Sequence, residues 1–224
     1  TTALQIGEQS GGAFDIGVGA LVSACGFGPQ AAAEQLPPRS PRAGDALELD
    51  VPRRAARTHS RISLDLNGIA KGFAVDQLAR CLQKHGVHDF LVGIDGEMRA
   101  AGHKPDGSAW AVALEKPLRG RREVLGALEL TDASIATSGD YRHWRERDGT
   151  TFSHTMDPHS GAPLVSTLTS VSVICTSCMY ADAWATALLV LGVERGSQLA
   201  KAQGLSAIFV LREGDALREI TVGL

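Results

Sequence analysis

Apolar and polar residues follow two different periods along the chain, and each period predicts one kind of element. Strict alternation, the pattern of a half-buried strand, occurs at 46–51, 61–66 and 169–174. Short apolar runs predict further strands at 90–94, 109–114, 126–130 and 134–137. Helical spacing runs from Ile69 to His85 and ends at Gly86, with an expected apolar face made by Ala70, Phe73, Ala74, Gln77, Leu78 and Leu82.

The two ends of the chain complete the predicted set of elements. A helix from Leu4 is closed by the glycine pair Gly11-Gly12, and two helices are expected at about 180–192 and 193–203. A terminal hairpin is predicted from 206–211 and 218–222 around a polar turn at 212–215, and 30–46 form a surface connection. Strands grouped in runs between a few helices indicate an α+β fold with mixed, largely antiparallel sheets and flanking helices, in one domain spanning 1–224.

Composition narrows the class of protein. The chain has 224 residues, 44% hydrophobic and 21% charged, which is typical of a globular domain with a sizeable core. A net charge of -3 argues against a nucleic-acid partner, and the one basic run, Arg119-Gly-Arg-Arg122, is interpreted as a solvated turn. No stretch approaches the roughly 20 apolar residues of a transmembrane helix. The first residues also lack the charged start and apolar core of a signal peptide.

The pair Cys175-Thr-Ser-Cys178 has the spacing of redox or zinc motifs. The chain offers no second pair and no thioredoxin-like context, and the pair follows an apolar alternating strand. Buried, unreactive thiols are therefore the preferred interpretation.

Asp182 and Thr186 are the first candidates for chemistry. They stand four positions apart in an alanine- and leucine-rich segment, so both side chains project from one helical face. A carboxylate and a hydroxyl supply hard oxygen ligands of the kind that suit Mg²⁺. Taken alone, the pair is better explained by an aspartate near a helix start and a threonine facing a neighbouring turn.

The segment Asp65-Leu-Asn-Gly-Ile-Ala-Lys-Gly72 predicts a strand, a tight turn and a helix start. Such a junction offers backbone N–H groups to an anion, and Gly68 and Gly72 allow a pyrophosphate to come close while Lys71 adds a point charge. The alternative is a plain strand-to-helix turn with an exposed lysine. Asp76, further into the helix, is interpreted as a solvated or helix-stabilising carboxylate.

Several other motifs join these two segments. They are Gly12-Ala-Phe-Asp15, Gly26-Phe-Gly-Pro29, Thr137-Ser-Gly-Asp140 and the run from His154 through Asp157-Pro-His-Ser-Gly161, where Asp157-Pro158 suits a turn. In this order, from about Gly11 to Gly192, the motifs make the chain resemble the ApbE family of FAD:protein FMN transferases. One departure is Asp95-Gly-Glu97, where relatives show Gly-Gly-Asp, and Asp95 could crowd the pocket.

The resemblance implies Mg²⁺-dependent transfer of FMN from FAD to a Thr or Ser hydroxyl of an acceptor protein, with release of AMP. An FAD pyrophosphatase and a non-catalytic FAD-binding protein are the alternatives. By resemblance, His154 and Lys71 act in catalysis, and Mg²⁺ is held by Asp182, Thr186 and the carbonyls of Gly68 and Ala185. The residues implied to contact FAD are Ala13, Phe14, Asp15, Asp65, Lys71, Ser138, Gly139, His154 and Met156.

The resemblance also implies a partner protein and a cellular location. The acceptor is expected to belong to a redox complex, in the periplasm or cell envelope of a bacterium, and the oligomeric state is left open. Relatives carry a further N-terminal portion that supplies part of the flavin pocket. This chain, which starts at Thr1 without methionine, is expected to lack that portion.

Overall fold

The computed structural model describes residues 1–28, 33, 35–147, 150–214 and 216–224. Pro29 of the predicted Gly26–Pro29 motif lies outside these residues, as do 30–32 and 34 of the surface connection and Asp215 of the hairpin turn. The chain divides into two compact units, one made of 1–66 and 143–165 and the other of 67–142 and 166–224. The expectation of a single domain stays a prediction.

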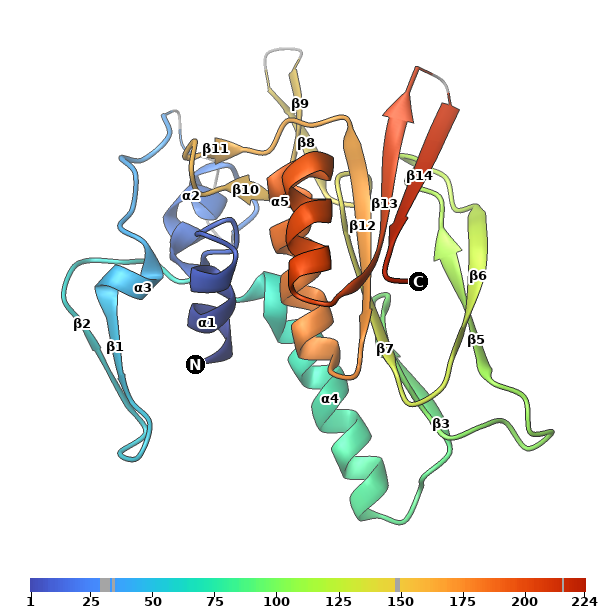
Figure 1. Cartoon of the computed structure of the whole chain (residues 1–224). Coiled ribbons are helices and arrows are strands. Elements are labelled where there is room, and N and C mark those ends of the chain that lie inside the picture. Colours follow the sequence, from blue (N-terminus) through green and yellow to red (C-terminus); the bar gives the residue numbers. More distant parts are fainter. Residues whose placement is uncertain (29–32, 34, 148–149, 215) are drawn as a thin grey trace. The chain divides into compact units, whose positions relative to one another are not determined.

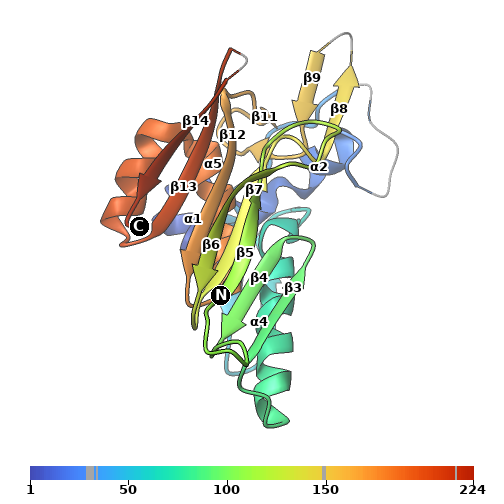
Figure 2. The same ribbon diagram turned by 90° about the vertical axis from the view of Figure 1, so that its right-hand side faces the viewer.

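The second unit is built on a six-stranded antiparallel sheet, in the order β14-β13-β12-β7-β4-β3 (Figure 2). Its strands are β3 (Phe90–Ile94), β4 (Glu97–Ala101), β7 (Ser134–Gly139), β12 (Leu168–Cys175), β13 (Ser206–Glu213) and β14 (Ala216–Val222). All of them except β4 were predicted, with ends that differ by a few residues. The terminal hairpin is confirmed as β13 and β14.

Two helices and a hairpin cover the two faces of this sheet (Figure 1). The helices α4 (Asn67–Lys84) and α5 (Cys178–Ala202) pack together, and Gly192 at φ 75° interrupts α5 where the sequence predicts a break. On β13, the fully buried Phe209 packs against Gly196 of α5. Its neighbours Ile208 and Val210 share a core with β5 (Trp110–Glu115) and β6 (Val124–Leu130). The alternation along a strand therefore produces three layers.

The buried face of α4 is not the predicted one. Phe73 and Leu78, expected on the apolar face, are 49% and 44% exposed. The buried residues are instead Ile69, Gly72, Val75, Asp76 and Ala79. The reason is close helix packing, because a Cβ at Gly72 would lie 2.3 Å from the carbonyl oxygen of Cys178. Small residues fit this contact, and the larger apolar side chains point away from it.

The first unit consists of short elements around a small core of Leu21, Val22, Cys25 and Met156. Its helices are α1 (Thr2–Gln9), the 3-10 helix η1 (Ile16–Val18), α2 (Gly19–Ala24) and α3 (Ala43–Ala46). Its strands form three hairpins: β1 (Leu47–Asp50) with β2 (Ala55–Thr58), β8 (Trp144–Arg147) with β9 (Thr150–Ser153), and β10 (Met156–Asp157) with β11 (Ala162–Pro163). The first helix and the strand near 46–51 are confirmed.

The predicted strand at 61–66 is wrong. This segment has no ladder partner and makes isolated hydrogen bonds with the η1–α2 region. The N–H of Gly19 donates to the carbonyl of Ser63 at 3.1 Å, and the N–H of Asp65 donates to the carbonyl of Ile16 at 2.8 Å. The alternation did not reflect burial on one face of a sheet, because Leu64 and Leu66 are 47% and 50% exposed.

The overall content of strands and helices confirms the α+β class with largely antiparallel sheets. Within the part of the chain that the structure describes, no helix is both long enough and apolar enough to cross a bilayer.

Candidate functional site

Asp182 and Thr186 lie on the face of α5 that is turned towards the sheet and α4. Asp182 is 3% exposed, and its Oδ2 accepts a hydrogen bond of 2.9 Å from the N–H of Gly72 on α4. One turn further on, the hydroxyl of Thr186 lies 3.0 Å from the hydroxyl of Ser138 on β7. Ala185 between them is fully buried. The fold therefore brings oxygen groups from α5 and β7 together beside the N-terminal part of α4.

Burial raises the pKa of Asp182 to about 7. The hydrogen bond from Gly72 and the charge of Lys71 act in the opposite direction, whereas the charge of Glu97 raises the pKa further. A buried carboxylate of this kind is stabilised in its ionised form when a positive charge binds to it.

Lys71 is held by two acidic side chains in the second unit. Its Nζ lies 2.8 Å from Oε1 of Glu97 and 3.8 Å from Oδ2 of Asp95. The Glu97 side chain is 2% exposed, and burial raises its pKa although the Lys71 hydrogen bond lowers it. Its other oxygen, Oε2, is buried and has no hydrogen-bond partner within the described ranges. Sequence reasoning missed this role of Glu97 because the strand that carries it, β4, was not predicted.

Asp95 occupies the tight turn between β3 and β4. Ile94 pairs with Glu97, so Asp95 and Gly96 form a two-residue loop with φ of 50° and 109°. Asp-Gly is a favoured pair for a hairpin turn that needs two positive φ values. Arg142 donates to the Asp95 carbonyl at 3.1 Å. Asp95 therefore suits the turn that it occupies, and the suggestion that it could crowd the pocket stays a prediction.

Of the two interpretations of Asp76, the solvated carboxylate is wrong. Asp76 is 2% exposed, and it stabilises the start of α5 rather than its own helix. Its carboxylate accepts from the N–H groups of Cys178 and Met179, both at 3.1 Å, and from the hydroxyl of Ser177 at 2.7 Å. Arg99 lies 2.6 Å from it. Burial raises the pKa of Asp76, but these donors outweigh it and hold the pKa below the usual range.

The two cysteines of the candidate motif are free. Cys178 is fully buried at the start of α5, and Cys175 is half-buried at the end of β12 with its thiol donating to the Ser177 carbonyl. Burial raises the pKa of both thiols. The interpretation as buried thiols is confirmed for Cys178, and Cys175 is only half-buried.

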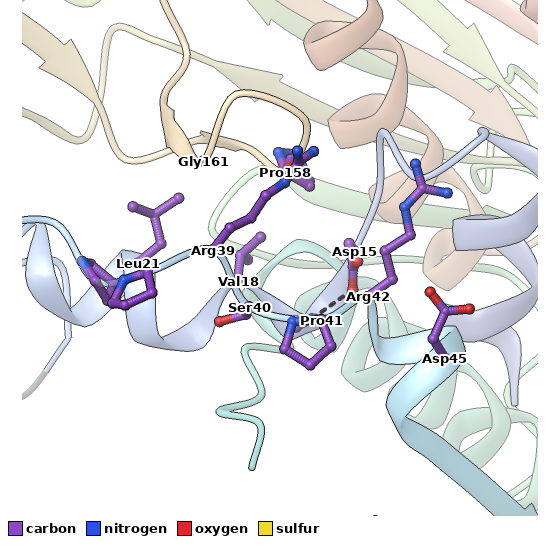
Figure 3. A pocket seen from close by; sticks show the side chains of 13 residues that line it. Asp15, Val18, Leu21, Arg39, Ser40, Pro41, Arg42, Asp45, Pro158 and Gly161 are labelled. Carbon is purple, nitrogen blue, oxygen red and sulfur yellow. Dashed lines mark hydrogen bonds between the residues drawn. The ribbon is translucent and has the colours of Figure 1, made fainter. Parts of the chain in front are cut away.

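The first unit holds another group of predicted residues, with Asp15 beside a cavity (Figure 3). Oδ1 of Asp15 accepts from the N–H of Gly17 at 2.7 Å and of Ala43 at 3.0 Å. The cavity has a volume of about 320 Å³. Its lining includes Asp15, Val18, Leu21, Asp45 and the proline-rich segment 37–42, which contains Arg39 and Arg42. Ala13 and Phe14, which precede Asp15 in the sequence, are buried, at 1% and 4% exposure.

His154 lies in the first unit, half-buried, between β9 and β10. Its Nδ1 is 3.2 Å from the carbonyl oxygen of His143, and the two imidazole rings are 5.3 Å apart. Asp157 accepts from the N–H of His159 at 2.8 Å, which confirms its role in a turn. Met156 is 5% exposed and packs in the small core of this unit.

The predicted site residues thus fall into two sets, each within one unit. The second unit contains Gly68, Lys71, Ser138, Gly139, Asp182, Ala185 and Thr186, and the first contains Ala13, Phe14, Asp15, Asp65, His154 and Met156. Among the residues described, no three His, Cys, Asp or Glu side chains lie together in one cluster. A cation at Asp182 would therefore depend mainly on hydroxyl and carbonyl oxygens.

The fold and the site together define an antiparallel α+β protein with an Asp–Thr pair on one helix beside the glycine-containing start of another. The pattern of the ApbE family matches residues 1–209, and the chain belongs to that family.

Individual relatives agree with the family match. The chain is 37% identical over 231 residues to the FAD:protein FMN transferase of Vibrio cholerae serotype O1, covering 97% of this chain and 67% of that protein. It is 35% identical over 228 residues to the protein of the same name from Escherichia coli K12, covering 97% and 65%. The crystal structure of the Pseudomonas stutzeri flavinyl transferase ApbE, apo form, matches with a TM-score of 0.85 at 39% identity, covering 99% of this chain and 70% of that one. The chain therefore spans about two thirds of the length of its curated relatives.

Proposed function

We propose that this chain is an enzyme that transfers FMN from FAD to a Thr or Ser hydroxyl of an acceptor protein and releases AMP. Membership of the ApbE family and the names of the matched relatives support this activity. The observation that carries it furthest is the buried Asp182, fixed by the N–H of Gly72, with Thr186 one turn away.

The residues present fit a Mg²⁺ ion. Two carboxylates, Asp182 and Glu97, are buried at 3% and 2% exposure, and the Lys71 ammonium pairs with Glu97. One oxygen of Glu97 is buried and lacks a hydrogen-bond partner in the described structure, and a nearby cation would stabilise such a carboxylate. Asp182, Thr186 and the carbonyls of Gly68 and Ala185 would hold the ion. When bound, it would neutralise charge on the pyrophosphate of FAD and polarise the phosphorus under attack.

The start of α4 supplies the remaining groups for the pyrophosphate in this proposal. The N–H of Gly72 already donates to Asp182, so the backbone groups offered to an anion are those that precede it, near Gly68. Lys71 keeps its side chain 39% exposed while it pairs with Glu97, so its ammonium also borders solvent. Its charge would offset the negative charge that develops on the departing AMP.

His154 is proposed to take the proton from the incoming hydroxyl. A carbonyl oxygen can only accept, so Nδ1 donates to His143 and Nε2 carries the lone pair. The hydroxyl oxygen forms a bond to the phosphorus on the FMN side, the bond from that phosphorus to the bridging oxygen breaks, and this oxygen leaves with AMP. The proton of the hydroxyl moves to His154.

One incubation separates the proposal from its alternatives. The protein is mixed with FAD, Mg²⁺ and a candidate acceptor, and the products are read as AMP, free FMN and fluorescent protein bands. We expect AMP together with a labelled acceptor, and Asp182→Ala is the matched control. AMP with free FMN would indicate a pyrophosphatase, and neither product would indicate a protein that only binds FAD.

The acceptor is proposed to be a subunit of a redox complex, and the site of action to be outside the cytoplasm. The relatives' names support a protein acceptor without specifying which one. Labelling a bacterial envelope fraction and a cytoplasmic fraction side by side with this protein would test both proposals, since the labelled band should arise from the envelope.

A further inference from the structure

Lys71 and Glu97 form an ion pair whose members lie on two regular elements, the helix α4 and the strand β4. Glu97 is the first residue of β4, directly after a two-residue turn, and its side chain has almost no exposed surface. Lys71 extends from α4, and the Nζ–Oε1 distance of 2.8 Å is that of a charge-assisted hydrogen bond. The two carboxylate oxygens of Glu97 are unequal, because Oε1 has the ammonium and Oε2 has no partner in the described part of the chain.

This pair lies next to the proposed metal site. Gly72, which follows Lys71 in α4, donates its N–H to Asp182. The charges of Lys71 and Glu97 both act on Asp182, with opposite signs. An ammonium in this position repels a divalent cation and can itself serve as the counterion of Asp182, so an uncompensated Lys71 would oppose metal binding.

We propose that Glu97 is a positioning residue that keeps the Lys71 ammonium on its own carboxylate and balances its charge, so that Asp182 remains available to a divalent cation. This inference rests on the proposed function of Asp182 as a metal-binding residue. It gives the pair a role in the electrostatics of the site, in addition to its contribution to stability.

The proposal predicts effects of opposite sign for the two members of the pair. Glu97→Gln keeps the size of the side chain but removes the charge, so Lys71 keeps only the more distant and more exposed Asp95, at 3.8 Å, as an acidic partner, and Mg²⁺ should bind about tenfold more weakly, equal to about 1.4 kcal/mol. Lys71→Gln removes the repelling charge, so Mg²⁺ should bind at least as tightly as to the wild type. The double variant restores neutrality and should bind within about twofold of the wild type.

A pair that only supports the fold would behave differently. All three variants would then bind Mg²⁺ more weakly, and the double variant would be no better than Glu97→Gln. Lys116 and Glu123, a Lys–Glu pair at 3.1 Å on the exposed loop between β5 and β6, provide a matched control. Glu123→Gln should leave Mg²⁺ binding unchanged.

The experiment is calorimetric titration of each purified full chain with Mg²⁺ alone, with circular dichroism to verify the fold. Restoration of binding in the double variant supports the proposal, and tight binding by Glu97→Gln or weak binding by the double variant overturns it. If Glu97→Gln does not fold, Lys71→Gln and the double variant decide, since weakened binding by either contradicts charge balance. A wild-type protein that takes up no Mg²⁺ would overturn the metal assignment at Asp182 itself, and the inference with it.

Discussion

Replacing Asp76 by asparagine removes a buried negative charge while the size of the side chain stays the same. In the wild type, Oδ1 lies 2.6 Å from Nη1 of Arg99 and 3.1 Å from the N–H of Cys178. Oδ2 accepts from the hydroxyl of Ser177 at 2.7 Å and from the N–H of Met179 at 3.1 Å. Asparagine keeps one acceptor oxygen, and its NH₂ group faces backbone N–H or guanidinium donors that cannot accept from it, the Ser177 hydroxyl being the one partner able to do so.

The expected cost follows from these contacts. Two charge-assisted hydrogen bonds are lost, at roughly 1.5–3 kcal/mol each, and α5 loses an anion at its N-terminus, worth about 0.3–1 kcal/mol. These contributions overlap and do not simply add. The Arg99 side chain is 25% exposed, so water replaces part of the hydrogen bonding that the guanidinium loses with the carboxylate. We therefore expect Asp76→Asn to lower the free energy of unfolding by about 3 kcal/mol.

Urea unfolding followed by circular dichroism measures this loss. The slope of the free energy of unfolding against urea concentration should be the same for the variant and the wild type. Asp106→Asn is the matched control, because the hydrogen bonds of Asp106 within the described residues stay inside its own turn, to Ser108. The unfolding midpoint of Asp106→Asn should stay at the wild-type value. A loss below about 1 kcal/mol for Asp76→Asn would show that the four contacts contribute far less than charge-assisted bonds do.

The same variant should show a defined dependence on pH. The pKa of Asp76 is lowered by folding, so the ionised carboxylate stabilises the fold above the usual aspartate pKa of about 3.9. This stabilisation is lost as the pH falls through the lower folded pKa. The difference in stability between wild type and Asp76→Asn should accordingly be constant near neutral pH and shrink below about pH 4.

Three further predictions concern the site. Asp182→Ala should abolish Mg²⁺-dependent release of AMP with an unchanged circular dichroism spectrum, and wild-type rates would refute the metal assignment. Gly72→Ala should destabilise the protein by at least about 3 kcal/mol in urea unfolding, because its Cβ would lie 2.3 Å from the Cys178 carbonyl oxygen, whereas Gly126→Ala, with open space around it, should not. His154→Asn should lower the transfer rate about 10²–10⁴-fold and remove the rising limb of the pH–rate profile. Loss of FAD binding with an unchanged rate on bound FAD would make His154 a residue that binds the cofactor.

The period of a helix could be predicted from the sequence, but not the face it buries. In α4 the bounds are within two residues of the prediction, yet Phe73 is 49% exposed and Gly72 is buried. Hydrophobicity favours the larger side chains as the inner face. The contact with α5 selects the smallest ones, because two backbones can approach closely only where side chains are short. Such a contact depends on the partner helix and is not encoded in the local pattern.

The site shows the same division. Asp182 and Thr186 could be predicted because their spacing on one helix is local. Glu97 could not, because β4 reads Glu-Met-Arg-Ala-Ala and has the burial order buried, half-buried, half-buried, buried, buried, which is not the alternation expected of a strand. Its contact with Lys71 spans 26 residues of sequence, and only the folded sheet brings them together.

The contacts of α4 with α5 also explain why packing and chemistry are coupled in this protein. Gly72 and Asp76 are one turn apart on α4, and they contact Cys178 and Asp182, one turn apart on α5. These contacts fix the register of the two helices, and the register determines which backbone groups at the start of α4 lie beside Asp182. A shift of one helix along the other would separate the oxygen groups without altering any of them. Substitutions in the helix interface, far from any reacting atom, should therefore change metal affinity as well as stability.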